Sequence, residues 1–208
     1  MKKLTPQTNS GNMQAVKRMP QYLRLFNDML KYGRQYISSV EIASKLSLRP
    51  ILVKKDMLLA KAPGKTRLGY NVKGSIAAIQ NFLGWQKERE VCLVGYGKLG
   101  SALFHYEGFK KHGFNMVAAF DTDITKADND KVLHIEHLAS YVQSRKINTA
   151  IISVPAYAAQ GVADTLVSAG IKAIWNFSPA DIKVPAHVAL QNEDLSIGLA
   201  LLCLKLKN

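Results

Sequence analysis

Apolar residues recur every three or four positions in the first part of the chain, which is the spacing of helices with one buried face. The first segment starts at Pro20 and ends before Gly33, a residue type that commonly stops a helix. A second, short helix is predicted after the cap Ser38-Ser39, and a third from Pro50 to about residue 61. The turn 47–49 between the last two segments predicts a helix-turn-helix.

A basic stretch with glycines follows the third predicted helix. Residues 62–70 read Ala-Pro-Gly-Lys-Thr-Arg-Leu-Gly-Tyr, which is typical of a hairpin, and an amphipathic segment then runs to Gly84. A recognition helix followed by a basic hairpin is the arrangement of a winged-helix DNA-binding domain, which we predict over residues 16–86. The alternative is a small helical bundle that docks on another protein. Residues 1–15 are polar and without periodicity, and we predict a flexible leader there.

The second part of the chain alternates short apolar runs with helical segments. The apolar runs and the predicted helices cover residues 91–94, 101–111, 116–120, 135–142, 149–154, 158–169 and 170–177. This alternation predicts an α/β fold, a doubly wound parallel sheet of the Rossmann type, over residues 87–192. A ligand of such a sheet binds at the carboxyl ends of its strands.

The last segment, residues 195–207, is apolar on nearly every side. A helix with hardly any polar face has to be covered by other protein. It could complete the core of its own domain or insert between two subunits. We expect the second arrangement, a domain-swapped C-terminal helix over residues 193–208.

A glycine motif stands where the first apolar run of the second part ends. Gly95, Gly97 and Gly100 form G-x-G-x-x-G, and Asp121 ends the next apolar run. In a Rossmann unit these glycines admit a pyrophosphate close to the backbone, and the acid accepts hydrogen bonds from an adenosine ribose. We therefore predict dinucleotide binding; a glycine turn in another kind of α/β domain is the alternative. NAD(H) is favoured over NADP(H), because Asp121 would repel a 2′-phosphate and Lys126 could offset that repulsion only in part.

The 208 residues carry a formal net charge of +13, and the excess lies almost entirely in the first domain. Residues 1–86 hold 15 Lys or Arg and 3 Asp or Glu, a net +12, whereas residues 87–208 hold 13 and 12, a net +1. An excess confined to one domain favours a nucleic-acid partner over a merely solvated basic face. No apolar run has the length of a membrane span or the form of a signal peptide, so we expect a cytoplasmic protein.

The side chains that could do chemistry form no enzyme-like set. The histidines are His105, His112, His134, His137 and His187. They show no partners for hydride transfer, and the pair at 134 and 137 lacks a third metal ligand, which favours a surface turn. Cys92 and Cys203 are predicted to be small buried hydrophobic residues and not a redox pair. We therefore expect neither an enzyme nor a metal site.

Short motifs follow one another in a fixed order through both domains. They are RMPQYLR at 18–24, KKDM at 54–57, LGY at 68–70, GYGKLGSAL at 95–103, Tyr106, FDTD at 120–123, VP at 154–155, AAQ at 158–160, NFSP at 176–179 and NEDL at 192–195. In this order they resemble the Rex family of redox-sensing transcriptional repressors. The resemblance implies a homodimer that binds an AT-rich palindromic operator and senses the NADH/NAD⁺ ratio, with NADH releasing the DNA. It also implies that the C-terminal helix is exchanged between subunits.

The motifs and the resemblance together predict three groups of site residues. The cofactor-binding residues are Gly95, Tyr96, Gly97, Lys98, Leu99, Gly100, Asp121, Thr122, Lys126, Val154, Pro155, Asn176, Phe177, Ser178 and Leu195. The DNA-binding residues are Arg18, Ser39, Arg49, Lys54, Lys55, Lys61, Lys65, Arg67 and Tyr70. A nucleotide-sensitive switch, implied by the resemblance alone, comprises Arg24, Tyr106 and Asp194. An Arg–carboxylate pair with a phenol partner can form or break as a unit, and a static ion pair is the alternative.

Several DNA-binding positions depart from the family pattern. Arg49 stands where a Ser or Thr helix cap is usual, and Arg67 stands for a glycine of the wing. Lys54 replaces an arginine, which keeps the charge but weakens the bidentate reading of guanine. The alternative function is an NAD-dependent oxidoreductase or a CoA-binding domain with a basic N-terminal extension.

Overall fold

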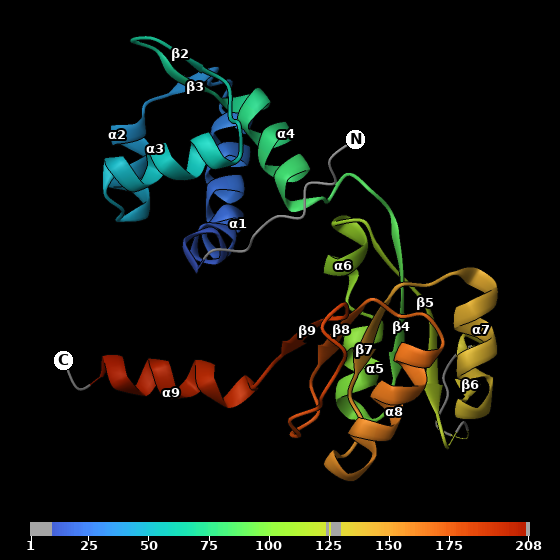
Figure 1. The fold of residues 1–208 in the computed structure, drawn as a ribbon. Coiled ribbons are helices and arrows are strands. Elements are labelled where there is room, and N and C mark those ends of the chain that lie inside the picture. Colours follow the sequence, from blue (N-terminus) through green and yellow to red (C-terminus); the bar gives the residue numbers. More distant parts are fainter. Residues whose placement is uncertain (1–9, 124, 126–129, 207–208) are drawn as a thin grey trace. The chain divides into compact units, whose positions relative to one another are not determined.

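The chain folds into two compact units, Met1–Lys87 and Glu88–Asn208, in the computed structural model of Figure 1. The structure describes residues 10–123, 125 and 130–206. Within these ranges, no helix is long and apolar enough to cross a membrane. Each unit builds its hydrophobic core from its own residues.

Helices around a small antiparallel sheet make up the N-terminal unit. Its elements are α1 (Ser10–Lys31), β1 (Tyr36–Ile37), α2 (Ser39–Leu46), α3 (Pro50–Leu59), β2 (Gly64–Lys65), β3 (Gly69–Asn71) and α4 (Val72–Leu83). The strands lie in the order β1-β3-β2. Met19, Tyr22 and Phe26 of α1 are fully buried in a cluster with side chains of α2, α3 and α4, so the buried face of α1 holds this unit together.

The predicted helix-turn-helix and hairpin are confirmed. The Ser38 hydroxyl accepts a hydrogen bond from the backbone N–H of Glu41 at 3.1 Å and starts α2. Ser47 ends α2 in the left-handed conformation, with φ 54°, and Pro50 is the first residue of α3. Strands β2 and β3 then pair antiparallel, which forms the wing.

The predicted leader is wrong for residues 10–15, because α1 begins at Ser10 and runs through Pro20. Proline in a helix interior removes one hydrogen bond and costs about 3 kcal/mol. Here Ala15 and Met19 continue the apolar stripe of α1 before the proline and are buried. Their burial extends the helix beyond the start that the local pattern predicts. Residues 1–9 lie outside the described ranges.

The second unit is a parallel sheet with helices on both faces, as predicted. Its elements are β4 (Arg89–Val94), α5 (Lys98–Phe104), α6 (Glu107–Lys111), β5 (Phe114–Asp121), β6 (Val132–His134), a 3₁₀ turn (Ile135–His137), α7 (Leu138–Arg145), β7 (Thr149–Ile152), α8 (Ala156–Ser168), β8 (Ala173–Asn176), β9 (Ala189–Asn192) and α9 (Leu195–Lys205). The strand order is β6-β5-β4-β7-β8-β9, with every neighbouring pair parallel.

Alternate residues of β4 point into two separate cores. Cys92 and Val94 pack with α7 and α8, whereas Val91 and Leu93 pack with Phe104 of α5 on the other face. Strand β4 has β5 on one side and β7 on the other, so the direction in which the sheet is built reverses there. In open α/β sheets the ligand binds beyond the carboxyl ends of the strands at this reversal.

Some elements of the second unit differ from the prediction. The single helix expected over residues 101–111 is two helices, α5 and α6, with a break at His105 and Tyr106. Strands β6 and β9 were not predicted, because β6 has only 3 residues and β9 is a largely exposed edge strand without an apolar run. Helix α7 follows a 3₁₀ turn and starts three residues later than expected.

Helix α9 leaves its apolar side chains uncovered in the single chain. Its large apolar residues are all exposed, namely Leu195, Ile197, Leu199, Leu201, Leu202 and Leu204. Cys203 is exposed as well, so the prediction that both cysteines are buried holds only for Cys92. The helix does not complete the core of its own unit.

Candidate functional site

The three motif glycines at the end of β4 differ in how much space surrounds them. Gly95 has φ +98°, and a Cβ there would lie 2.7 Å from the carbonyl of Ser153. A Cβ on Gly100 would overlap the carbonyl oxygen of Gly95. A Cβ on Gly97, by contrast, would meet no protein atom within 4 Å, and its φ is an ordinary −72°. The protein itself therefore requires glycine at 95 and 100, whereas the space beside Gly97 is left for something else.

The carboxylate of Asp121 is held beside this glycine loop. It accepts hydrogen bonds from the backbone N–H of Tyr96 at 2.5 Å and from that of Asp123 at 2.9 Å. These bonds fix an acceptor group at the carboxyl end of β5, where a ribose hydroxyl pair binds in Rossmann units. Thr122 is exposed next to it, and Lys126 lies outside the described residues.

Tyr96, a predicted cofactor-binding residue, contributes its backbone to the glycine loop. The ring is buried, and it packs edge-to-face on Phe104 with the centroids 5.8 Å apart. Its backbone N–H is the group that reaches Asp121. Lys98 and Leu99, the next two residues, are exposed in the first turn of α5.

The loop after β7 forms the next wall of the site. The Ser153 hydroxyl donates to the carbonyl oxygen of Gly95 at 2.8 Å, which ties this loop to the glycine loop. Val154 is half-buried, and Pro155 is the exposed N-cap residue of α8. Sequence analysis did not identify Ser153, since its partner is a backbone carbonyl 58 residues away.

The loop after β8 is shaped by a buried amide. Asn176 donates to the carbonyl of Ala180 at 2.9 Å and to Asn192 Oδ1 at 3.0 Å, and its own oxygen accepts from the N–H of Ser178 at 3.0 Å. The side chain of Asn176 therefore supports its own loop. Its direct contact with a cofactor stays a prediction.

A cavity of about 640 Å³ opens beyond this loop, lined by residues 177–181 and 192–197. The Ser178 hydroxyl is buried at its wall and has no hydrogen-bond partner among the residues that the structure describes. A buried hydroxyl without a partner costs about 1–3 kcal/mol, which a ligand that bonds to it would recover. Phe177 and Leu195, two predicted cofactor residues, line the same cavity with apolar surface.

These loops offer what a dinucleotide requires. The glycine loop has room at Gly97, Asp121 is a fixed acceptor, and Ser178 is an unpaired polar group in a partly apolar cavity. The residues present therefore fit NAD(H). Within the described ranges, His, Cys, Asp and Glu form no cluster that could hold a metal ion.

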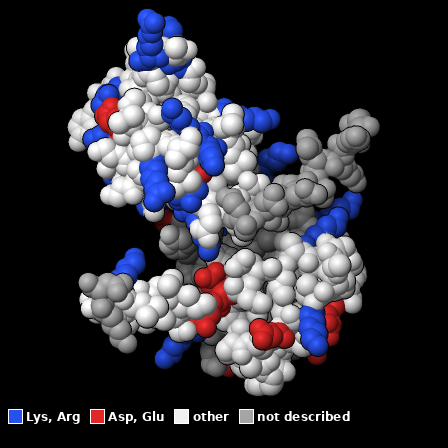
Figure 2. Space-filling model, turned by 60° about the vertical axis from the view of Figure 1, so that its left-hand side comes forward, with Lys and Arg blue, Asp and Glu red and all other residues white. Residues whose placement is uncertain are grey.

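The N-terminal unit presents cations on its surface (Figure 2). Most predicted DNA-binding side chains are exposed on the α3 segment and the wing, namely Arg49, Lys54, Lys55, Lys61, Lys65 and Arg67. Lys61 and Arg67 both have positive φ, 57° and 66°, a conformation that costs L-residues about 1–2 kcal/mol. Ser39 and Tyr70 are half-buried, and Tyr70 packs against the core of the unit, where burial raises its pKa.

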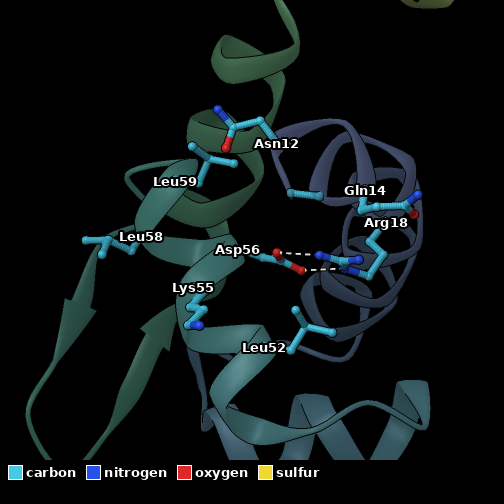
Figure 3. A pocket seen from close by; sticks show the side chains of 9 residues that line it. Asn12, Gln14, Arg18, Leu52, Lys55, Asp56, Leu58 and Leu59 are labelled. Atoms are coloured by element: carbon cyan, nitrogen blue, oxygen red, sulfur yellow. Dashed lines mark hydrogen bonds and ion pairs between the residues drawn. The ribbon is translucent and has the colours of Figure 1, made fainter. Parts of the chain in front are cut away.

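Arg18, a predicted DNA-binding residue, forms an ion pair inside the N-terminal unit, and its contact with DNA stays a prediction. Its Nε and Nη2 donate to the two carboxylate oxygens of Asp56 at 2.7 and 2.8 Å (Figure 3). The Tyr22 hydroxyl donates to the same carboxylate at 2.7 Å. Asp56 is only 2 % exposed. Burial and the bond to Asp56 raise the pKa of Tyr22, so the phenol keeps its proton and remains a donor. We call these three residues the α1–α3 clamp, because they join α1 to the predicted recognition helix.

The three predicted switch residues belong to two different units of the chain. Arg24 is exposed on α1 in the N-terminal unit, whereas Tyr106 and Asp194 lie in the second unit. Tyr106 packs edge-to-face on Phe109 with the centroids 5.1 Å apart. Asp194 is the N-cap of α9, where it accepts from the Ser196 hydroxyl at 2.6 Å and from its N–H at 2.8 Å; these bonds lower the pKa of Asp194.

Known proteins are similar to this chain in both of its units. Residues 13–57 match the family model "Putative DNA-binding protein N-terminus", and residues 86–180 match "CoA binding domain". The chain is 44% identical over 192 residues to the redox-sensing transcriptional repressor Rex of Treponema denticola, covering 90% of this chain and 91% of that one. It is 39% identical over 191 residues to the protein of the same name from Desulfitobacterium hafniense, with 90% and 91% covered.

Solved structures are similar to this chain over nearly its whole length. The crystal structure of RSP in complex with β-NAD⁺ and operator DNA matches with a TM-score of 0.86 at 34% identity, covering 93% of this chain and 91% of that chain. The crystal structure of RSP in complex with β-NADH matches with a TM-score of 0.82 at 34% identity, with 93% of both chains covered. The likeness spans both units.

The glycine geometry predicts that the same substitution destabilises the protein at Gly100 and hardly at Gly97. Gly100→Ala should lower the free energy of unfolding of the second unit by about 1–3 kcal/mol, because its methyl group overlaps the Gly95 carbonyl. Gly97→Ala should change it by less than about 0.5 kcal/mol. Urea denaturation followed by circular dichroism measures both values, and equal losses would contradict this account of the loop.

The α1–α3 clamp predicts a strong effect on stability. Asp56→Ala should cost about 3–5 kcal/mol, because it leaves the Arg18 guanidinium without its partner, whereas Tyr22→Phe should cost about 1 kcal/mol. Glu41→Ala is the matched control: it breaks the exposed Arg34–Glu41 ion pair and should cost at most about 1 kcal/mol. Similar losses in the Asp56 and Glu41 variants on denaturation would show that the clamp is not a buried ion pair in solution.

Proposed function

Because this chain belongs to the Rex family of redox-sensing transcriptional repressors, we propose that it represses transcription by binding operator DNA and is released from it by NADH. One observation carries the proposal: the same chain holds an open dinucleotide loop at Gly97 and an exposed cationic helix-turn-helix with a wing. The curated relatives are named as regulators. In this proposal the chain is a regulator and not an enzyme.

The nucleotide in this proposal is NAD(H), held by the loops at the carboxyl ends of β4, β5, β7 and β8. Gly97 admits the pyrophosphate, Asp121 accepts from a ribose hydroxyl, and Ser178 gives a polar contact in the cavity beyond β8. Oxidised nicotinamide is cationic and reduced nicotinamide is neutral. The apolar surface of Phe177 disfavours an unpaired cation, which supports preferential binding of NADH, whereas the carboxylates of Asp181, Glu193 and Asp194 in the same cavity act in the opposite direction.

The working form in this proposal is a homodimer on an AT-rich palindromic operator. The exposed large apolar residues of α9 support it, since an apolar surface of this extent is rarely left in water. A second copy of the chain covers them by exchanging α9 between subunits. Dimers with a two-fold axis bind sites with matching two-fold symmetry. A cytoplasmic location agrees with a partner that is DNA.

The switch in this proposal is the network of Arg24, Tyr106 and Asp194, formed between units of the two subunits. Asp194 begins α9, so a helix exchanged between subunits moves this carboxylate into the neighbouring subunit. A charged Arg–carboxylate contact with a phenol partner has two discrete states, formed and broken. NADH shifts the balance only as far as it binds more tightly to the state that releases DNA.

Fluorescence polarisation on a labelled AT-rich palindromic duplex tests the function. The protein should bind at moderate salt in the presence of NAD⁺, and saturating NADH should displace it, because NADH favours the releasing state. Absence of binding, or binding that saturating NADH leaves unchanged, would refute the proposal.

Gly97→Ala should give a folded repressor that no longer responds to nucleotide. Its methyl group occupies the space left for the pyrophosphate, so NADH affinity should fall at least about tenfold, a loss of about 1.4 kcal/mol, while DNA binding without NADH should stay as in the wild type. Isothermal titration calorimetry and polarisation measure the two. Gly161→Ala is the matched control, because its Cβ also meets no protein atom within 4 Å and it lies on α8. Equal NADH affinity in the Gly97→Ala and Gly161→Ala variants would contradict the placement of the pyrophosphate at Gly97.

A further inference from the structure

The exposed face of α3 has an unusual composition. The core-facing residues of this helix are Val53, Asp56 and Met57, all buried. On the opposite side Ile51 is 60% exposed and Leu58 is 79% exposed. At 3.6 residues per turn, positions 51 and 58 lie on one line two turns apart. The centre of the face that points away from the core is therefore apolar.

Two cations flank this apolar line. Lys54 and Lys55 follow Ile51 by three and four positions, so they lie on either side of the line between Ile51 and Leu58. Both lysines are exposed, and in Figure 3 Leu58 points to the side of α3 away from α1. A face that only served solubility would not have its two apolar residues at the centre and its charges at the flanks.

The major groove of DNA has the complementary distribution. Its walls are phosphates and its floor is formed by base edges, among which thymine alone presents an apolar group, the C5-methyl. Flanking lysines suit the walls and a central aliphatic side chain suits a methyl group on the floor. Recognition helices contact base edges with their N-terminal residues, and Ile51 is the second residue of α3.

We propose that Ile51 is a specificity-determining residue that packs on the C5-methyl of a thymine in each operator half-site. The inference rests on the proposed DNA-binding function and adds the base that this side chain reads. Leu58 lies about 10 Å farther along the helix axis, at the C-terminal end of α3, and takes no part in this contact. The α1–α3 clamp holds Asp56 toward α1, which fixes the rotation of α3 and keeps Ile51 on the outer face.

Removing one methyl group from the DNA tests this contact directly. A palindromic duplex that the wild-type protein selects from a random pool in the presence of NAD⁺ serves as the probe, and deoxyuridine replaces its thymines one symmetric pair at a time. The replacement should matter at one thymine in each half-site. There it should raise the Kd of the wild-type protein about fourfold for each half-site, which corresponds to the free energy of burying one methyl group. For Ile51→Ala, binding to the thymine duplex should be weaker and the same replacement should have no effect.

Two variants separate this contact from other roles of the face. Leu58→Ala also truncates an exposed aliphatic side chain of α3, and it should keep the full effect of the methyl group. Lys55→Ala should weaken binding to every duplex by a similar factor and make the salt dependence less steep by about one charge. Ile51→Ala should keep the wild-type melting temperature, dimeric state and release by NADH, since the side chain is exposed.

Each contrary result has a distinct meaning. If the wild type binds and is released by NADH, but Ile51→Ala retains the same loss at every deoxyuridine, Ile51 reads no thymine and this inference alone fails. If Ile51→Ala alters the dimeric state, the residue is a protein contact and the inference also fails. If the wild type selects no duplex, the proposed function fails together with it.

Discussion

The second unit is organised by the close contact of backbone at the end of β4. Gly95 approaches Ser153 so closely that no side chain fits, Gly100 lies against the Gly95 carbonyl, and the Ser153 hydroxyl bonds to that same carbonyl. These contacts draw the loops after β4 and β7 together at the point where the order of the sheet reverses. Asp121 is added through the N–H of Tyr96, which belongs to the same loop. The open space at Gly97 is what remains after these constraints are met.

The N-terminal unit relies on a buried charge in a comparable way. The carboxylate of Asp56 is out of water and is compensated by Arg18 and Tyr22 of α1. Because the two helices share this ion pair, the orientation of α3 depends on α1. Helix α1 also carries Arg24, so any force on that side chain acts on the helix that positions the recognition face. The clamp gives a physical link between the switch we propose and the DNA-binding surface.

The local pattern of the sequence was sufficient for the architecture and for the glycine loop. Capping residues such as Ser38 and turn residues such as Gly95 act within a few positions, and apolar spacing reflects the face of each element that is buried. Several contacts that the pattern did not predict join residues distant in sequence. In the sequence Arg18 resembles the other basic residues of the domain, because its partner Asp56 lies 38 residues away. Asn176 reads as a polar group at a strand end until its bonds to Ala180 and Asn192 show that it is already engaged.

The exposed leucines of α9 also have a genetic consequence. In the homodimer we propose, each chain supplies α9 to its neighbour, so a chain with a damaged recognition helix still assembles normally with an intact one. Such mixed dimers have one functional DNA-binding unit for an operator that requires two. A copy of the gene that is defective only in α3 would therefore act dominantly, reducing repression by the intact copy in the same cell.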